Sequence, residues 1–209
     1  MDISTGWPSL ISTHGYIHGY IHGYPYPRQP WKEMSTPCEH IFPTMQRFNR
    51  HFPILWICNV RGGTCTKLDE IAEIILVNRI DIAVLVETWL HGGIHDDLIN
   101  IPGYTVYRKD RTDGRVGGGI LVYSRNEIPC HFQPQLDHVD MEVVWLLYRH
   151  ASMPREVSHI LIGAIYHPPH AHNGRMLDHL ISSMDTISRQ HPYTGRVLLG
   201  DFNQLPDSR

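Results

Sequence analysis

The sequence contains no long hydrophobic run. No stretch of its 209 residues approaches the roughly 20 consecutive apolar residues that a membrane-spanning helix requires. Its N-terminus also lacks a basic segment followed by an apolar one, so no secretory signal is visible. We therefore expect an intracellular protein, nuclear or cytoplasmic and not secreted, that has no membrane partner.

Cysteine is scarce, and neither sign of charge dominates. The four cysteines form no C-x-x-C pair, so we expect free thiols in a reducing compartment. A formal net charge of −3 excludes a histone-like cation that holds nucleic acid by bulk charge, although a local basic patch stays open. With 42% hydrophobic and 19% charged residues the chain falls in the globular range, and its length fits one domain with a tail.

Two common catalytic motifs are also missing. There is no G-x-x-x-x-G-K phosphate-binding loop and no G-x-S-x-G nucleophile elbow, which leaves acyl transfer unsupported. The run Gly117–Gly119 starts a predicted strand and not a helix. We therefore interpret it as a strand start or a sheet bend, and not as a phosphate loop.

Residues 1–51 differ in composition from the rest of the chain. They contain a tandem Gly-Tyr-Ile-His repeat followed by scattered prolines, so we predict a flexible, low-complexity arm. His14, His18 and His22 have the spacing that would align them for a metal ion on a helix. A glycine follows each of them, and each glycine costs about 1 kcal/mol in a helix. We therefore favour a disordered arm over a metal site there.

From residue 52 the pattern changes to alternating strands and helices, and we predict one domain over 52–209. Apolar runs predict strands at 54–60, 81–87, 104–108, 117–123, 141–148, 159–166 and 196–201. We expect Thr66, with Asp69 three residues on, to cap a helix after the first strand, and Asn173 to cap a second helix. The buried helical faces are expected to hold Leu68, Ile71, Ile74 and Ile75 in the first helix, and Leu177, Leu180, Ile181, Met184 and Ile187 in the second.

The connections between strands indicate the fold class. The crossover between the first two strands is long enough for a parallel β-α-β unit. A polar loop joins the strands at 141–148 and 159–166, which favours an antiparallel pair. These features predict an α/β protein with helices outside mixed sheets.

Polar side chains fall at the ends of the predicted strands. In α/β folds such positions let side chains converge outside the sheet while the backbone stays rigid. A single Glu, Asp or Asn in such a place is more often turn or cap chemistry. Together, two carboxylates, two amides and a phenol suit a phosphate and a hard cation such as Mg²⁺, which prefers one or two carboxylates plus water and substrate oxygens. The residues concerned are Asn59, Glu87, Tyr166, Asp201 and Asn203.

Seven short segments occur in an order that is typical of one family. They are Asn59 after its apolar strand, Glu87-Thr-Trp-Leu90, Ile101-Pro-Gly-Tyr104, Arg108-Lys-Asp-Arg111, Gly117-Gly-Gly-Ile120, Tyr166-His-Pro-Pro169 and Leu199-Gly-Asp-Phe-Asn203. Over about residues 52–207 the sequence resembles the endonuclease/exonuclease/phosphatase superfamily. Within it, the sequence is most similar to the apurinic-like endonuclease domains of LINE-type (non-LTR) retrotransposons.

The resemblance implies a fold, a cofactor and a role for each site residue. The fold would be a four-layer α/β/β/α sandwich of two packed mixed sheets. Glu87 would be the main Mg²⁺ ligand, with Mn²⁺ as a substitute, and Asn59 would help to hold the metal or the scissile phosphate. Tyr166 would donate to the phosphate or steady the developing charge. Asp201 would orient or deprotonate water, and Asn203 would fix Asp201 or the phosphate.

One departure from the family's pattern bears on activity. Members of the family carry a C-terminal Ser-Asp-His motif, and this sequence ends at Arg209 before it. We therefore expect a fragment whose sandwich is incomplete at the C-terminus. Unaided catalysis stands in question, because loss of a general acid or base commonly costs about 10²–10⁴-fold in rate.

Basic residues gather after the second predicted strand. They are Arg108, Lys109, Arg111, Arg115 and Arg125. Phosphate contact and an ordinary solvated loop are equal alternatives for this region. The candidate substrate-binding residues are Arg108, Arg111, Arg115 and, because it adjoins Tyr166, His167. We expect Trp89 to fill the core beneath its loop and not to stack on substrate.

The function that the resemblance implies is Mg²⁺-dependent phosphodiester hydrolysis by a retrotransposon-type DNA endonuclease that nicks target DNA. We expect a monomer whose partner is DNA; a reverse-transcriptase region of the same polyprotein is a candidate second partner. Two alternatives stay open because fold alone does not fix the substrate. One is a catalytically inactive truncated remnant that acts at most as a binding module, and the other is a phosphatase of the same fold.

Overall fold

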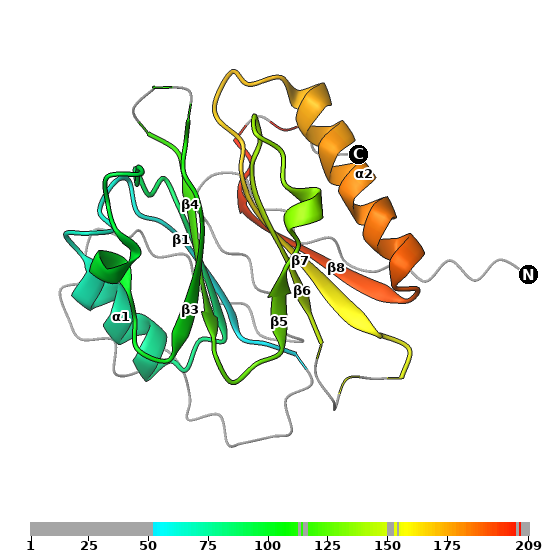
Figure 1. Ribbon diagram of the computed structural model, residues 1–209, viewed down its shortest axis with the longest axis horizontal. Coiled ribbons are helices and arrows are strands. Elements are labelled where there is room, and N and C mark those ends of the chain that lie inside the picture. The colour runs from blue at the N-terminus through cyan, green and yellow to red at the C-terminus, as the bar shows by residue number, and fades with distance from the viewer. Residues whose placement is uncertain are drawn as a thin grey trace, which may run out of the picture.

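The computed structural model describes residues 52–112, 114, 117–149, 153, 155–203 and 205. The predicted arm, with its three spaced histidines, lies outside the described residues, and so does Arg115. The described elements, shown in Figure 1, are β1 (Leu55–Asn59), α1 (Leu68–Val77), β2 (Ile82–Val86), the short 3₁₀ helix η2 (Asp96–Ile99), β3 (Tyr104–Lys109), β4 (Ile120–Arg125), β5 (Cys130–Phe132), the 3₁₀ helix η3 (Pro134–Leu136), β6 (Glu142–Tyr148), β7 (His159–Tyr166), α2 (Asn173–Gln190) and β8 (Thr194–Asp201).

The strands form two mixed sheets of four. One has the order β1-β2-β4-β3 and the other the order β5-β6-β7-β8. β1 and β2, which α1 connects along the chain, pair in parallel, and β6 and β7 run antiparallel. Both orientations were predicted from the connections. β7 and β8 are also parallel, with α2 as their crossover.

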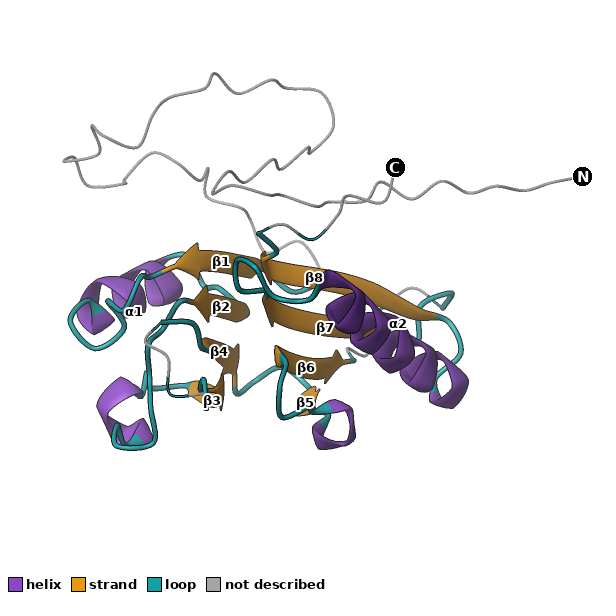
Figure 2. Cartoon of the chain, turned by 90° about the horizontal axis from the view of Figure 1, so that it is seen from above, coloured by secondary structure: helices purple, strands orange, loops and turns teal. Residues whose placement is uncertain are grey.

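The sheets pack face to face, and one helix covers each outer face. Figure 2 shows the four layers edge-on, with α1 outside the first sheet and α2 outside the second. The core between the sheets is built from inward-facing apolar residues of both, among them Val84, Val122, Leu146 and Ile162. The predicted four-layer α/β/β/α arrangement of two mixed sheets is therefore confirmed. Within the described part of the chain, no helix has both the length and the apolar character needed to cross a bilayer.

Several local predictions about the helices were wrong. The cap of α1 is Lys67 and not Thr66, because the Thr66 hydroxyl donates to the Gly63 carbonyl instead (3.3 Å). The cap of α2 is His172, whose Nδ1 accepts from the Arg175 N–H (3.2 Å). On the helical faces, the expected core residues Ile74 and Ile181 are 40% and 53% exposed, whereas Ile71, Ile75, Met176, Leu180, Ser183 and Ile187 are buried.

The alternation of side chains along β6, β7 and β8 places polar residues at one end of the space between the sheets. Val144, Ala164 and Leu199 are paired across the three strands and belong to the inter-sheet core. Two positions further toward one end, the same face carries a second paired row. That row consists of Glu142, Tyr166 and Asp201.

Candidate active site

Asp201 and Asn59 join the two sheets at this polar end. Asn59 ends β1 in the first sheet, and its amide Nδ2 donates to Asp201 Oδ2 across a distance of 3.2 Å. The amide oxygen of Asn59 accepts from the Arg61 N–H (3.2 Å), which fixes the orientation of the amide group. Asp201 ends β8 in the second sheet, where it pairs in register with Tyr166.

Glu87 forms a second link between the sheets. It follows β2 directly, and one carboxylate oxygen accepts a hydrogen bond from the Tyr166 hydroxyl on β7. The other oxygen accepts from the Trp89 indole N–H (2.7 Å) and from the Gly118 N–H (3.0 Å). The structure thus brings Glu87 to Tyr166 and Asn59 to Asp201, and the strand pairing sets Tyr166 beside Asp201.

These donors determine the protonation states of Glu87 and Tyr166. Burial raises the pKa of Glu87, but the hydrogen bonds from Tyr166, Trp89 and Gly118 and the charge of Arg111 outweigh it, so the pKa lies below its ordinary value. Burial, together with the hydrogen bond to Glu87 and its charge, raises the pKa of Tyr166. At neutral pH the site therefore holds an ionised carboxylate beside a protonated phenol, which is a hydrogen-bond donor.

Asn203 supports Asp201 from the loop after β8. Its backbone N–H donates to Asp201 Oδ1 (3.2 Å), and its side-chain amide donates to the carbonyl of His167 (2.7 Å). The His167 ring is only 1% exposed, and its Nε2 lies 2.8 Å from Asn173 Oδ1 at the start of α2. Asn203 therefore lies beside Asp201, whereas His167 is buried and does not lie on the surface of the site.

The glycine run contributes more to the site than the sequence suggested. β4 begins at Ile120, so the strand predicted from residue 117 starts three residues too early. Gly117, Gly118 and Gly119 instead form a turn with φ values of 101°, 72° and 86°, a region that L side chains rarely adopt. The N–H of Gly118 donates to Glu87, and that of Gly119 donates to Glu142. This turn binds two carboxylates.

Glu142 is a site residue that the sequence analysis missed. It begins β6, is 9% exposed, and accepts from Arg111 Nε (2.8 Å) in an ion pair whose side chains are both about nine-tenths buried. The guanidinium carbon of Arg111 in turn lies 5.7 Å from the centroid of the Tyr166 ring. The signal that could have revealed Glu142 is a carboxylate at the start of the otherwise apolar run 142–148, which is costly to bury unless paired.

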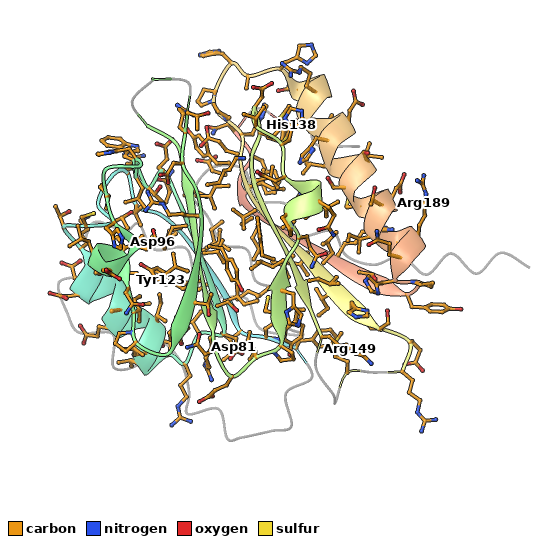
Figure 3. The ribbon with its side chains drawn as sticks, in the orientation of Figure 1. Asp81, Asp96, Tyr123, His138, Arg149 and Arg189 are labelled. Atoms are coloured by element: carbon orange, nitrogen blue, oxygen red, sulfur yellow. The ribbon has the colours of Figure 1, made fainter. Side chains whose placement is uncertain are left out.

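The other basic residues do not all face the site. Arg108 uses each of its five N–H donors within the protein, on Asp96, Asp110 and the carbonyls of His91 and Ile94. Arg125 lies at the far end of β4, where it pairs with Asp81 (3.0 Å). Figure 3 shows Asp81, the partner of Arg125, at the end of the sheets opposite His138. The expectation that Arg125 belongs to one cluster with the other basic residues is therefore wrong. Of Arg108, Arg111 and Arg125, it is Arg111 that contacts the site.

Trp89 does not fill the core, contrary to expectation. Its side chain is 46% exposed, while its indole N–H is bound to Glu87.

Several residues with a strained backbone also lie at this end of the sheets. The non-glycine residues concerned are Arg61, Glu87, Trp89 and Asn203, with φ values of 43°, 57°, 54° and 43°.

A model of the endonuclease/exonuclease/phosphatase family matches residues 58–209, which is well over half of the sequence. The chain belongs to this family. None of the curated proteins matches the sequence. The two-sheet fold and the family assignment therefore agree, and both confirm the resemblance carried by the ordered segments.

Several solved structures are similar to this chain at low sequence identity. The endonuclease domain of TRAS1, a telomere-specific non-LTR retrotransposon, is 14% identical with a TM-score of 0.52, and the match covers 75% of this chain and 63% of that domain. The AP endonuclease LMAP from Leishmania major is 16% identical (TM-score 0.47, 70% and 53% covered). ANGEL2, a 2′,3′-cyclic phosphatase, is 22% identical (TM-score 0.44, 67% and 44% covered). The chain thus spans less than two thirds of each of these structures.

The donor set at the site fits a hard divalent cation. The Glu87 carboxylate has about four lone-pair positions and accepts three donors, so capacity for a metal remains. The Asn59 amide oxygen would be a further oxygen ligand, and the amide nitrogen of Asn59 donates to the Asp201 carboxylate (3.2 Å), which suits Mg²⁺ with its retained waters. Across the described positions, no group of three or more His, Cys, Asp or Glu side chains is arranged as a metal cage. An all-protein cage of the zinc type is therefore not present in that part of the chain.

Proposed function

We propose that this family member is a Mg²⁺-dependent phosphodiesterase that nicks DNA, of the retrotransposon endonuclease type. One observation carries the proposal: Glu87, which follows β2, and Asp201, which ends β8, lie at the same end of the sheets, where Tyr166 donates to Glu87 and pairs in register with Asp201. Asn59 donates to Asp201 there. Hydrolysis of an anionic phosphodiester needs charge neutralisation, a base for water and a donor for the phosphoryl oxygens. The four side chains offer these functions together.

Each residue has a chemical role that follows from its contacts. Glu87 would hold the Mg²⁺, or Mn²⁺ in its place, with Asn59 as a further oxygen ligand, and the cation when bound would neutralise phosphate charge. Tyr166 stays protonated, and its hydroxyl donates a hydrogen bond to Glu87. When substrate enters, the same hydroxyl can donate to a phosphoryl oxygen instead. Asn59 donates to one carboxylate oxygen of Asp201 and Asn203 donates to the other. Each oxygen keeps a lone pair, with which Asp201 would orient and deprotonate water.

A plasmid-nicking assay tests this function. The 209-residue chain is incubated with supercoiled DNA and Mg²⁺, and conversion to the nicked form is compared with that of Glu87→Gln and Asp201→Asn. Glu127→Gln is the matched control, because Glu127 is exposed and follows β4 at the end of the sheets away from the site. We expect nicking by the wild type and the control, and a loss of about 10²–10⁴-fold in Asp201→Asn. Equal nicking by wild type and Glu87→Gln would contradict the proposal.

The same assay separates the two other functions that the fold permits. Release of inorganic phosphate from a phosphomonoester without any nicking would indicate a phosphatase of this fold. Binding of DNA without Mg²⁺-dependent cleavage would indicate a module that binds but does not react. The ordered segments Glu87-Thr-Trp-Leu90 and Tyr166-His-Pro-Pro169 favour the DNA-cleaving branch.

A further inference from the structure

Trp89 is a large aromatic side chain held half in water at the edge of the site. It lies two residues after Glu87, and its side chain is 46% exposed although its neighbours Thr88 and Leu90 are buried. Its backbone has a φ of 54°, a left-handed conformation that is strained for a non-glycine residue. Burial of the indole therefore does not account for this placement.

Three contacts fix the position of the indole ring. Its N–H donates to Glu87 Oε2 (2.7 Å), and its backbone N–H donates to the Gly118 carbonyl (3.0 Å). One face of the ring covers Gly62, where an added Cβ would lie 2.2 Å from Cε3 and 2.6 Å from Cδ2. Gly62 itself has a φ of 75° and donates to the Glu87 carbonyl (2.7 Å). The ring is thus backed by the chain at Gly62, while 46% of the residue stays exposed.

We propose that the exposed part of Trp89 is a stacking platform for a nucleobase next to the phosphate held at Glu87. This inference rests on the proposed function and names a feature of its substrate. A base in a regular duplex is already stacked on both sides, so only an unpaired or extruded base can reach a protein ring. The platform therefore selects DNA in which the nucleotide flanking the scissile phosphate is unstacked.

A second role for the ring must be separated from stacking. The indole N–H also positions the Glu87 carboxylate, so a substitution that removes the whole side chain disturbs both. Trp89→Phe keeps an aromatic face and removes the N–H donor. Trp89→Leu removes both, and Gly62→Ala keeps the tryptophan but displaces its ring, because the added Cβ has no room.

The experiment measures DNA binding by the 209-residue chain, with Ca²⁺ in place of Mg²⁺ so that the DNA stays uncut. The DNA carries one unpaired nucleotide on either side of a defined phosphate, and a matched set lacks the base at that nucleotide. Base–aromatic stacking corresponds to about 5- to 100-fold in affinity. We expect Trp89→Leu and Gly62→Ala to lose that factor on DNA that has the base, and on DNA that lacks it to lose no more than Trp89→Phe does. Trp89→Phe should lose less than about threefold on either.

Phe52→Leu is the matched control. Phe52 is an aromatic residue that is 52% exposed, and it lies before β1 at the end of the strand away from Asn59. Its substitution should leave both affinities unchanged. Far-UV circular dichroism of each variant checks that the fold is kept.

Two outcomes would overturn the inference. An equal loss by Trp89→Leu on DNA with and without the base would show that the ring acts only through Glu87. No loss by Trp89→Leu on either DNA would show that the ring is not a contact, and the proposed function would still stand if Glu87→Gln abolished nicking. If the wild type bound neither DNA, both the inference and the proposed function would fail.

Discussion

Glu142 shows how one carboxylate can organise several parts of the site. It binds the N–H of Gly119 in the turn and pairs with Arg111, and Arg111 lies over the ring of Tyr166. Glu142 therefore holds the turn in which the preceding residue, Gly118, donates its N–H to Glu87. We regard it as a positioning residue for the two groups that the proposed chemistry uses.

Removal of Glu142 should destabilise the protein through the ion pair. Both partners are about nine-tenths buried, and loss of one partner of a buried pair costs about 3 kcal/mol because the other charge is left uncompensated. We predict that Glu142→Leu lowers the free energy of unfolding in urea by about this amount. The double variant Glu142→Leu with Arg111→Met should be more stable than Glu142→Leu alone. A double variant that is less stable would contradict this account.

The lowered pKa of Glu87 makes a prediction about acid stability. A carboxylate with a folded pKa below its ordinary value of 4.5 stabilises the folded state above that value. This contribution is lost as the pH falls through the folded pKa. We predict that the free energy of unfolding falls less steeply in Glu87→Gln than in the wild type between about pH 5 and 3. Urea titrations over this range check it, and parallel curves would be inconsistent with the prediction.

At the scale of elements, the strands were predictable and their immediate ends were not. Apolar runs located seven of the strands within a few residues, because buried strands carry continuous hydrophobic sequence. Strand β5 was missed, since its three residues include two that are exposed. The helix caps failed because side chains such as Thr66 and Asn173 bind other partners, Gly63 and His167, which only the folded chain provides.

The glycine turn before β4 offers a test of an element whose shape is needed for the site. An added Cβ at Gly118 would lie 2.6 Å from both Arg111 Nη2 and Glu142 Oε2, whereas at Gly114 it would meet nothing within 4 Å. The two residues have similar φ values, 72° and 75°. We predict that Gly114→Ala costs only the strain of that conformation, about 1–2 kcal/mol, and leaves Mg²⁺ affinity unchanged.

Gly118→Ala should behave differently from this matched control. The crowded Cβ must displace the ion pair or the turn, so both stability and Mg²⁺ affinity should fall below those of Gly114→Ala. Urea denaturation and calorimetric titration with Mg²⁺ provide the two measurements. Identical values for the two variants would show that the turn has no part in shaping the site.

At the scale of the whole molecule, the site is a junction between two sheets that are distant in sequence. Asn59 and Asp201 are 142 residues apart, and Glu87 and Tyr166 are 79 apart. Apolar runs in the sequence located the strands, and the order of family segments suggested which of the polar residues near their ends converge. The sequence did not identify Arg111 as the partner of Glu142, since the two lie 31 residues apart, and it did not reveal the two glycine N–H donors.

Two histidine pairs should make the stability of the fold depend on pH near neutrality. The rings of His159 and His191 are tilted against each other with centroids 4.3 Å apart, and those of His138 and His179 lie 5.6 Å apart. Burial, and then the neighbouring histidine, lower the pKa of His159 and of His179 below 6.5. A histidine with a lowered folded pKa takes up its proton more readily when unfolded, so stability is full above about pH 6.5 and falls as the pH drops below it.

The corresponding measurement is urea unfolding between about pH 7.5 and 5. We predict a decrease in the free energy of unfolding over this range in the wild type. The decrease should be smaller in His159→Gln and in His179→Gln. His95→Gln is the control, because the His95 side chain is 79% exposed. An equal decrease in all four proteins would contradict the assignment to these pairs.

The central claim is that Glu87, with Asn59 as a further oxygen ligand, holds one divalent cation next to Asp201, the base for water. Calorimetric titration of the 209-residue chain with Mn²⁺, in competition with Mg²⁺, tests it most directly, because it does not depend on turnover. The account predicts one site in the wild type and in Glu127→Gln, weaker binding in Asn59→Ala, and no binding in Glu87→Gln. Unchanged Mn²⁺ affinity in Glu87→Gln would contradict it.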